Sequence, residues 1–166
     1  MAKVTLHEKP VTTVGELPQV GAKAPAFTLV GKDLGDVSLA DYAGRTVVLN
    51  IFPRMDTSVC AESVRRFNAE ASEFGKAAVL CVSMDLPFAQ ERFCGSEGLK
   101  NVVTLSAFRS PTFASEYGVG LTDGPIAGLL TRAVVVIDAE GVVRYAELVP
   151  EITQEPDYAA AIASMP

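Results

Sequence analysis

Two β-branched apolar runs on either side of one amphipathic segment constrain the fold of this chain more than any other feature. The runs are 46–52 (TVVLNIF) and 77–84 (AAVLCVSM), and neither has a helical period, which is typical of strands buried on both faces. The apolar residues between them recur at helical spacing: Val64, Phe67, Ala71 and Phe74. Gly75 supplies a helix stop. The pattern predicts a β-α-β unit whose strands run parallel.

The C-terminal half contains further helix and strand signals. In order, we expect a helix from Pro87 to about Gly95 or Gly98, a strand near 102–105, a short helix with Ser110 as its cap, Pro111 as its first residue and Gly118 as its stop, and a Gly-rich loop over 119–130. Residues 133–149 form two apolar runs around 138–141 (DAEG), which predicts an antiparallel hairpin. A last helix is expected within PDYAAAIASM.

The predicted order of elements defines a fold class. The order β-α-β-α-β-α-β-β-α, with parallel strands first and antiparallel strands last, is that of an elaborated thioredoxin-like fold. Near the start, VTLHEKPVTTVGEL alternates apolar and polar residues around Pro10, which indicates a short hairpin. We therefore expect an α/β protein with a mixed central sheet flanked by helices, an N-terminal β-hairpin extension, and one domain over residues 1–166.

Composition excludes several classes of function. A net charge of -6 and a pI near 4.8 argue against a nucleic-acid partner. The start MAKVTLHEKP lacks the apolar stretch of a secretory signal, and no run reaches the ~18 apolar residues of a membrane span, so we expect a cytoplasmic protein with no membrane partner. His7 is the only histidine and the three cysteines have no C-x-x-C spacing, so neither a metal nor another cofactor is predicted.

The segment 53–60 (PRMDTSVC) carries the clearest chemical signal. It follows the first buried strand, at the strand end where sites of open α/β sheets lie. If Thr57 caps the next helix, Cys60 is its third residue, close to unpaired backbone N–H groups. These dipoles and an adjacent cation would favour a thiolate. Asp56 opposes this effect, so a compensating cation is expected. In a reducing compartment, any disulfide would be transient.

Each residue of this segment also has a structural interpretation. Cys60 alone could be a small buried apolar residue. Thr57 could be only a helix cap, although its spacing of three from Cys60 would let the hydroxyl donate to the sulfur or to a peroxide oxygen. Pro53 could be only a strand terminator, although its ring would also shield a thiolate from water.

The motif P-x-x-x-T-x-x-C at this strand end resembles the active-site motif of the peroxiredoxin superfamily. The segments SVCAESVRRFN, SMDLPFAQERFC, GLLTRAVVVID and ELVPEITQEP extend the resemblance, to the bacterial thiol peroxidase subfamily, along essentially the whole chain. The resemblance implies that Cys60 is the peroxidatic cysteine, that Thr57 and Pro53 complete the pocket, and that Arg132 holds the thiolate and the peroxide. It also implies that Cys94 resolves the Cys60 sulfenic acid by forming an intramolecular disulfide.

The position of Arg132 agrees with that role, because it stands at the start of a predicted strand, where a guanidinium can donate several hydrogen bonds. Five other arginines remain rivals for the cation: Arg54, Arg65, Arg66, Arg92 and Arg109. Cys94 lies near the end of the second predicted helix. If the reduced protein holds Cys60 and Cys94 on separate helices, with Cα atoms farther apart than the roughly 4.4–6.8 Å of a disulfide, local unwinding around both cysteines is expected. Cys81 lies inside an apolar run and is expected to have no catalytic role.

The resemblance further implies the substrate and the partners. Hydroperoxides, alkyl rather than hydrogen peroxide by preference, would be reduced to alcohol or water, with thioredoxin as the reductant. A homodimer built near the active-site face is also implied. Two alternatives stay open: a peroxide-responsive redox sensor that uses the same disulfide, and a thioredoxin-like oxidoreductase or binding module. The missing C-x-x-C argues against the oxidoreductase.

Overall fold

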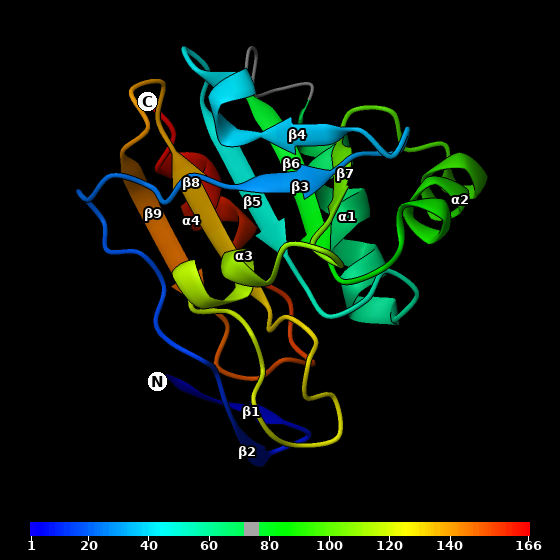
Figure 1. The fold of residues 1–166 in the computed structure, drawn as a ribbon, viewed down its shortest axis with the longest axis vertical. Helices are drawn as coiled ribbons and strands as arrows, with labels where there is room; N and C mark the ends of the chain where they lie inside the picture. The colour runs from blue at the N-terminus through cyan, green and yellow to red at the C-terminus, as the bar shows by residue number, and fades with distance from the viewer. Residues whose placement is uncertain (72–76) are drawn as a thin grey trace.

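The computed structural model describes residues 1–71 and 77–166, and a mixed sheet lies at its centre (Figure 1). Within these residues the sheet has seven strands in the order β4-β3-β7-β6-β5-β8-β9. Their bounds are Asp36–Ser38, Thr28–Val30, Val103–Ser106, Ala78–Ser83, Val47–Ile51, Ala133–Ile137 and Val143–Leu148. The pairs β5·β6 and β6·β7 are parallel, and the other neighbours are antiparallel. The predicted β-α-β unit and the mixed sheet are therefore confirmed.

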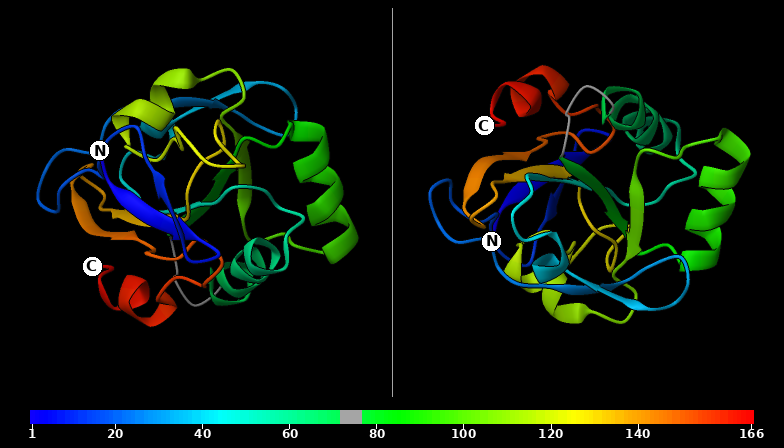
Figure 2. Two further views of the ribbon diagram at one scale, coloured as in Figure 1. Left: turned by 90° about the horizontal axis from the view of Figure 1, so that it is seen from below. Right: turned by 90° about the horizontal axis from the view of Figure 1, so that it is seen from above.

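The central strand β5 shows why the sheet separates two cores. All five of its residues are buried, and alternate side chains point to opposite faces. Leu49 belongs to the cluster that contains Phe113 of α3 (Pro111–Glu116). Val48 belongs to the cluster that contains Phe67 of α1 (Ser58–Ala71) and Tyr158 of α4 (Tyr158–Ala163). Helices α1 and α4 thus cover one face and α3 the other (Figure 2).

Helix α2 (Pro87–Glu97) has both of its predicted end signals. Pro87 occupies the first turn, where its missing N–H costs nothing. Gly98, with φ of 68°, ends the helix and donates its N–H to the Cys94 carbonyl, so the stop is at Gly98 and Gly95 lies within the helix. The predicted stop of α1 at Phe74 and Gly75 lies outside the described residues.

The N-terminal hairpin is present as predicted. It consists of β1 (Lys3–Leu6) and β2 (Lys9–Thr12), and its turn is His7-Glu8, with φ of 50° and 68°. The hairpin docks on the loop after β9, because the Thr5 N–H donates to the Pro150 carbonyl at 2.8 Å. Figure 1 shows the hairpin at the bottom of the view, below the start of α1.

Three details differ from the sequence expectations. Strands β3 and β4 were not predicted, because each has only three residues, too few to show an alternating pattern. Ser110 makes no cap hydrogen bond; its hydroxyl donates to the Thr28 carbonyl at 2.7 Å and ties α3 to β3. The helix α3 ends at Glu116, before Gly118, and within 119–130 a short bridge pairs Gly120 with Leu130.

No helix among the described residues is long and apolar enough to cross a membrane.

Gly118 is required by both its conformation and its surroundings. Its φ is 65°, and a Cβ added there would lie 2.1 Å from the Glu16 carbonyl oxygen. We expect Gly118→Ala to lower the free energy of unfolding by about 2–4 kcal/mol, measured by urea denaturation, because positive φ and overpacking combine. Gly95→Ala is the matched control, since a Cβ there meets nothing within 4 Å. Equal stability of Gly118→Ala and the unmodified protein would contradict this prediction.

Candidate active site

Cys60 lies in the first turn of α1, directly beyond the end of β5. The helix begins at Ser58, and the Ala61 N–H donates to the Thr57 carbonyl at 2.9 Å, so Thr57 has the cap position and Cys60 is the third helical residue. The Cys60 side chain is 1% exposed. The first N–H groups of a helix have no partner within the helix, and their dipoles favour a negative charge nearby. The predicted placement of Cys60 is therefore found.

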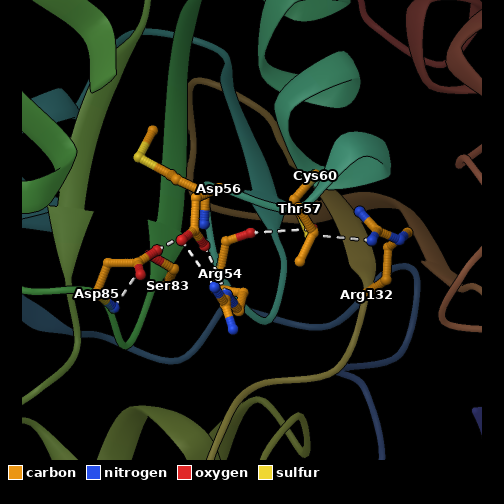
Figure 3. A network of polar contacts seen from close by, with 8 residues as sticks. Arg54, Asp56, Thr57, Cys60, Ser83, Asp85 and Arg132 are labelled. Carbon is orange, nitrogen blue, oxygen red and sulfur yellow. Dashed lines mark hydrogen bonds and ion pairs between the residues drawn. The ribbon is translucent and has the colours of Figure 1, made fainter. Parts of the chain in front are cut away.

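Arg132 is the cation beside this sulfur (Figure 3). It precedes β8, is 2% exposed, and donates from Nη2 to Cys60 Sγ at 3.1 Å. Its Nε donates to the Ile152 carbonyl at 2.8 Å, which fixes the guanidinium plane. A buried guanidinium is costly unless an anion faces it, so this contact stabilises the thiolate form of Cys60. Within the described structure Nη1 is buried and has no hydrogen-bond partner, so it is available to another acceptor.

The five rival arginines make no hydrogen bond to the sulfur in the described structure, although Arg54 also lines the Cys60 pocket. Four of the five rivals pair with carboxylates: Arg54 with Asp56, Arg65 with Glu97, Arg66 with Glu70 and Arg109 with Asp36. Arg92 is exposed on α2. Of these six arginines, the structure places Arg132 in hydrogen-bond contact with Cys60.

Asp56 was expected to oppose a thiolate, and the structure shows how its charge is balanced. Both of its carboxylate oxygens accept from Arg54, at 2.5 Å from Nε and 2.7 Å from Nη2. These hydrogen bonds lower the pKa of Asp56 and raise that of Arg54. The Asp56 charge near the start of α1 is thus balanced by Arg54, while Arg132 faces the Cys60 sulfur.

The Thr57 hydroxyl differs from the expectation that it would contact the sulfur. Its Oγ1 donates to the Arg54 carbonyl at 3.3 Å, across the bend that leads into α1 (Figure 3). The side chain is half-buried. In this χ1 rotamer the Thr57 hydroxyl therefore stabilises the bend before the helix. A different χ1 rotamer would be needed to point the hydroxyl at a bound oxygen.

Asp85 holds the active-site loop and was missed by the sequence reasoning. Its Oδ2 accepts from the Met55 N–H at 2.8 Å and from the Ser83 hydroxyl at 2.7 Å, and its carbonyl accepts from Ser106 Oγ at 2.6 Å. These bonds fasten the loop after β5 to the ends of β6 and β7, and Figure 3 shows Asp85 beside Ser83 at the end of β6. A polar residue just after the neighbouring parallel strand was the signal available in the sequence.

A pocket of about 620 Å³ opens onto Cys60. Four of the predicted site residues line it together: Pro53, Thr57, Cys60 and Arg132. A mostly apolar wall of the pocket comes from the N-terminal hairpin, from the loop before β8 and from the loop after β9: Leu6, His7, Pro125, Ile126, Leu129, Ile152 and Thr153. The pocket therefore combines a sulfur, an unpartnered guanidinium N–H and an apolar wall, which suits a small amphipathic ligand with a polar oxygen end.

Cys94 lies apart from this pocket. It is half-buried near the end of α2 and lines a different pocket, of about 590 Å³. Burial raises the pKa of the Cys94 thiol. The two helices are joined by Arg65 of α1, whose Nη2 donates to Glu97 Oε1 of α2 at 3.0 Å. In the structure described here, Cys60 and Cys94 are free thiols.

Cys81 has the environment of a core residue. It is fully buried in β6, and burial raises its pKa to about 12, with a weak opposing contact from Asn50 Nδ2 at 3.8 Å. The thiol therefore stays protonated at neutral pH, and a protonated thiol is a poor nucleophile. This geometry agrees with the expectation that Cys81 has no catalytic role.

The fold and the site together define a class of protein: an α/β protein of thioredoxin-like fold with a cysteine at a helix N-terminus, faced by a buried arginine. The Redoxin family model matches residues 19–162. The chain therefore belongs to the redoxin family.

Comparisons over the whole chain agree with this assignment. Proteins named thiol peroxidase in Mycobacterium bovis and Mycobacterium tuberculosis are each 59% identical over 165 residues, which cover 99% of both chains. The crystal structure of a peroxiredoxin-like protein from Aquifex aeolicus superposes with a TM-score of 0.92, at 40% identity, over 98% of this chain and 95% of that one. A thiol peroxidase from Chromobacterium violaceum has a TM-score of 0.89 at 23% identity, over 95% of this chain and 91% of that one, and shows the shared fold. The resemblance to peroxiredoxins, including the thioredoxin-like fold, is confirmed.

Proposed function

We propose that this chain is a single-domain thiol peroxidase that reduces hydroperoxides at Cys60. The observation that carries the proposal is the Arg132 guanidinium, which donates from Nη2 to Cys60 Sγ at 3.1 Å and keeps a second, buried Nη1 without a partner in the described structure. One donor stabilises the attacking sulfur, and the other is available to the peroxide oxygen. Membership of the redoxin family and relatives named thiol peroxidase support the same activity.

The first step is a two-electron transfer. The Cys60 thiolate attacks the terminal peroxide oxygen, the S–O bond forms as the O–O bond breaks, and the leaving alkoxide takes a proton to become an alcohol, or water from hydrogen peroxide. Sulfur is oxidised to a sulfenic acid and the peroxide is reduced. In this proposal Arg132 Nη1, which is buried and has no partner in the described structure, donates to the leaving oxygen as charge develops on it. It thus stabilises the transition state more than the ground state. Pro53 and Thr57 shield this reaction from water.

The second step in the proposal is resolution by Cys94. Its thiol attacks the Cys60 sulfenic sulfur, an S–S bond forms, and water leaves. A disulfide requires Cα atoms about 4.4–6.8 Å apart, whereas the two cysteines stand on separate helices and line separate pockets. The first turn of α1 and the segment around Cys94 therefore unwind, which would also hydrate the Cys94 thiol and remove the burial that raises its pKa. Superimposable backbones of the reduced and oxidised protein would contradict this rearrangement.

The ion pair between Arg65 and Glu97 would not prevent that unwinding. Both side chains are partly exposed, and an exposed pair contributes about 0.2–1 kcal/mol. The contact orients α2 on α1 while the protein is reduced and is weak enough to break in each turnover.

Replacing Cys94 with serine is expected to separate the two steps. Cys94→Ser should consume one equivalent of hydroperoxide and stop at the Cys60 sulfenic acid, because no second thiol reaches it. Steady-state turnover should fall by about two orders of magnitude or more, since the remaining path depends on a slow external thiol. The measurement is peroxide-dependent NADPH oxidation with thioredoxin and thioredoxin reductase, with trapped sulfenic acid identified by mass spectrometry. Undiminished turnover by Cys94→Ser would assign resolution to another group.

The same coupled assay decides between the classes of function. Sustained NADPH consumption supports the peroxidase with thioredoxin as the reductant. The proposed compartment is the reducing cytoplasm. A single stoichiometric oxidation supports a redox sensor, and no reaction supports a binding module. The apolar wall of the pocket supports a preference for alkyl hydroperoxides over hydrogen peroxide.

The proposal also includes a homodimer near the active-site face. Three apolar side chains are exposed just beyond the ends of β6 and β7, at the sheet edge where the Cys60 loop also lies: Leu86 at 50%, Phe88 at 64% and Phe108 at 40%. Exposed apolar residues gathered in one region are typical of an interaction surface. Sedimentation equilibrium tests the proposal, and a monomer at micromolar concentration would contradict it.

A further inference from the structure

The Glu151 carboxylate joins the N-terminal hairpin to the loop after β9. Its Oε1 accepts from Thr5 Oγ1 at 3.0 Å and from the Glu8 N–H at 2.8 Å. Its Oε2 accepts from the His7 N–H at 3.3 Å and from the Thr153 N–H and hydroxyl at 2.9 and 2.7 Å. The bonds from Thr153 and from the hairpin lower the pKa of Glu151 to about 2. The carboxylate is therefore ionised at neutral pH and accepts five hydrogen bonds.

The hairpin turn depends on this carboxylate. His7 and Glu8 both have positive φ, of 50° and 68°, which is unfavourable for residues that carry a Cβ. Successive N–H groups in such a turn converge on one point and form a concave anion site. Glu151 supplies the anion, so the turn retains its shape although it contains no glycine.

The two segments that Glu151 joins form one wall of the Cys60 pocket. Leu6 and His7 of the hairpin and Ile152 and Thr153 of the loop line the pocket, whereas Glu151 does not. Main-chain bonds reinforce the contact, because the Ile152 N–H donates to the Thr5 carbonyl at 2.8 Å. These residues line the same cavity of about 620 Å³ as Cys60 and Arg132. The organic group of a bound hydroperoxide is attached to the oxygen that Cys60 does not attack. We expect this group to contact the wall.

We propose that Glu151 is a positioning residue for substrate selectivity: it holds the hairpin so that Leu6 and His7 contact the organic group of an alkyl or aryl hydroperoxide. The inference rests on the proposed peroxidase function. Hydrogen peroxide has no organic group, so its reaction requires Cys60 and Arg132 but not the hairpin. Glu151 thus affects one class of substrate and leaves the other nearly unchanged.

The test compares Glu151→Gln with the unmodified protein in single-turnover oxidation of Cys60, followed by stopped-flow with cumene hydroperoxide and with hydrogen peroxide. A glutamine turns an amide NH₂ toward the N–H donors of the turn, so the hairpin loosens. We expect the rate constant for cumene hydroperoxide to fall about tenfold and that for hydrogen peroxide to change less than about twofold. Glu140→Gln, an exposed residue in the β8–β9 turn, is the matched control.

Leu6→Ala provides a second variant that keeps the Glu151 contacts. It shortens a half-buried side chain of the wall and should produce the same selective loss. Equal losses with both hydroperoxides, or an unchanged ratio of the two rate constants in both variants, would refute the role of Glu151 while the peroxidase function stands. An unmodified protein that reacts with neither hydroperoxide would refute the proposed function and this inference with it.

Discussion

Cys60→Ser is expected to abolish hydroperoxide reduction, by about four orders of magnitude or more, because a serine hydroxyl beside Arg132 is not ionised at neutral pH and cannot replace a thiolate as nucleophile. The fold should persist, since serine is close to cysteine in size and the sulfur makes its one described hydrogen bond with Arg132. The measurement is loss of hydroperoxide over time in the thioredoxin-coupled assay.

Cys81→Ser is the matched control for this result. Cys81 is as deeply buried as Cys60 but lies in β6 with Asn50 as its polar neighbour, and a serine there can accept the same amide hydrogen. The control should retain turnover. Residual activity of Cys60→Ser equal to that of Cys81→Ser would place the chemistry elsewhere in the chain.

Arg132→Lys is expected to slow the oxidation of Cys60 about 10²–10³-fold, the cost of removing one preorganised donor from an anionic transition state. Lysine keeps the charge but lacks the planar fork, so it cannot donate to the Ile152 carbonyl, to Cys60 Sγ and to a substrate oxygen in one geometry. Stopped-flow rate constants for the first oxidation measure this effect without interference from resolution.

The control for the arginine variant is Arg109→Lys, because Arg109 pairs with Asp36 at the surface. Thermal unfolding of both variants checks that the buried site still folds. A rate constant for Arg132→Lys within about threefold of the unmodified protein would mean that charge alone suffices, and the directional role of the guanidinium would be wrong.

The three cysteines illustrate how surroundings assign different chemistry to one side chain. Cys60 has a helix N-terminus and a guanidinium, which stabilise an anion. Cys81 has an amide at 3.8 Å and a raised pKa, which keep it neutral. Cys94 is half-buried, with a pKa raised by that burial. Peroxide chemistry is therefore expected at Cys60 first, and we expect Cys94 to gain reactivity only when its helix opens.

The parts of the fold that the sequence predicts are those with strong local patterns. Residues 46–52 and 77–84 are almost continuously apolar, with no alternation of apolar and polar residues, so the sequence predicts strands that are buried on both faces. Strands β5 and β6 lie in these two segments. Helix α2 was located by Pro87 and Gly98 rather than by an apolar stripe. Strands β3 and β4 have only three residues each and form a local hairpin, so they were too short to give an alternating pattern of their own, and β3 joins the sheet through the distant pair Val30 and Ser106.

The site shows the same division. The position of Cys60 in the first turn of α1 followed from a cap and a spacing. The burial of Arg132 could not follow from local sequence, because it depends on the loop that carries Ile152. Likewise, Arg54 pairs with Asp56, and the Thr57 hydroxyl donates to the Arg54 carbonyl in the same bend. The spacing of residues in the sequence does not determine which acceptor a hydroxyl binds.

The most direct test of the account is to treat the reduced protein with one equivalent of cumene hydroperoxide and to map its thiols by peptide mass spectrometry. We expect a peptide that contains Cys60 linked to one that contains Cys94, with Cys81 still a free thiol, and a Cys60 sulfenic acid when Cys94 is replaced by serine. Oxidation that begins at Cys94 or Cys81 while Cys60 remains reduced would contradict it.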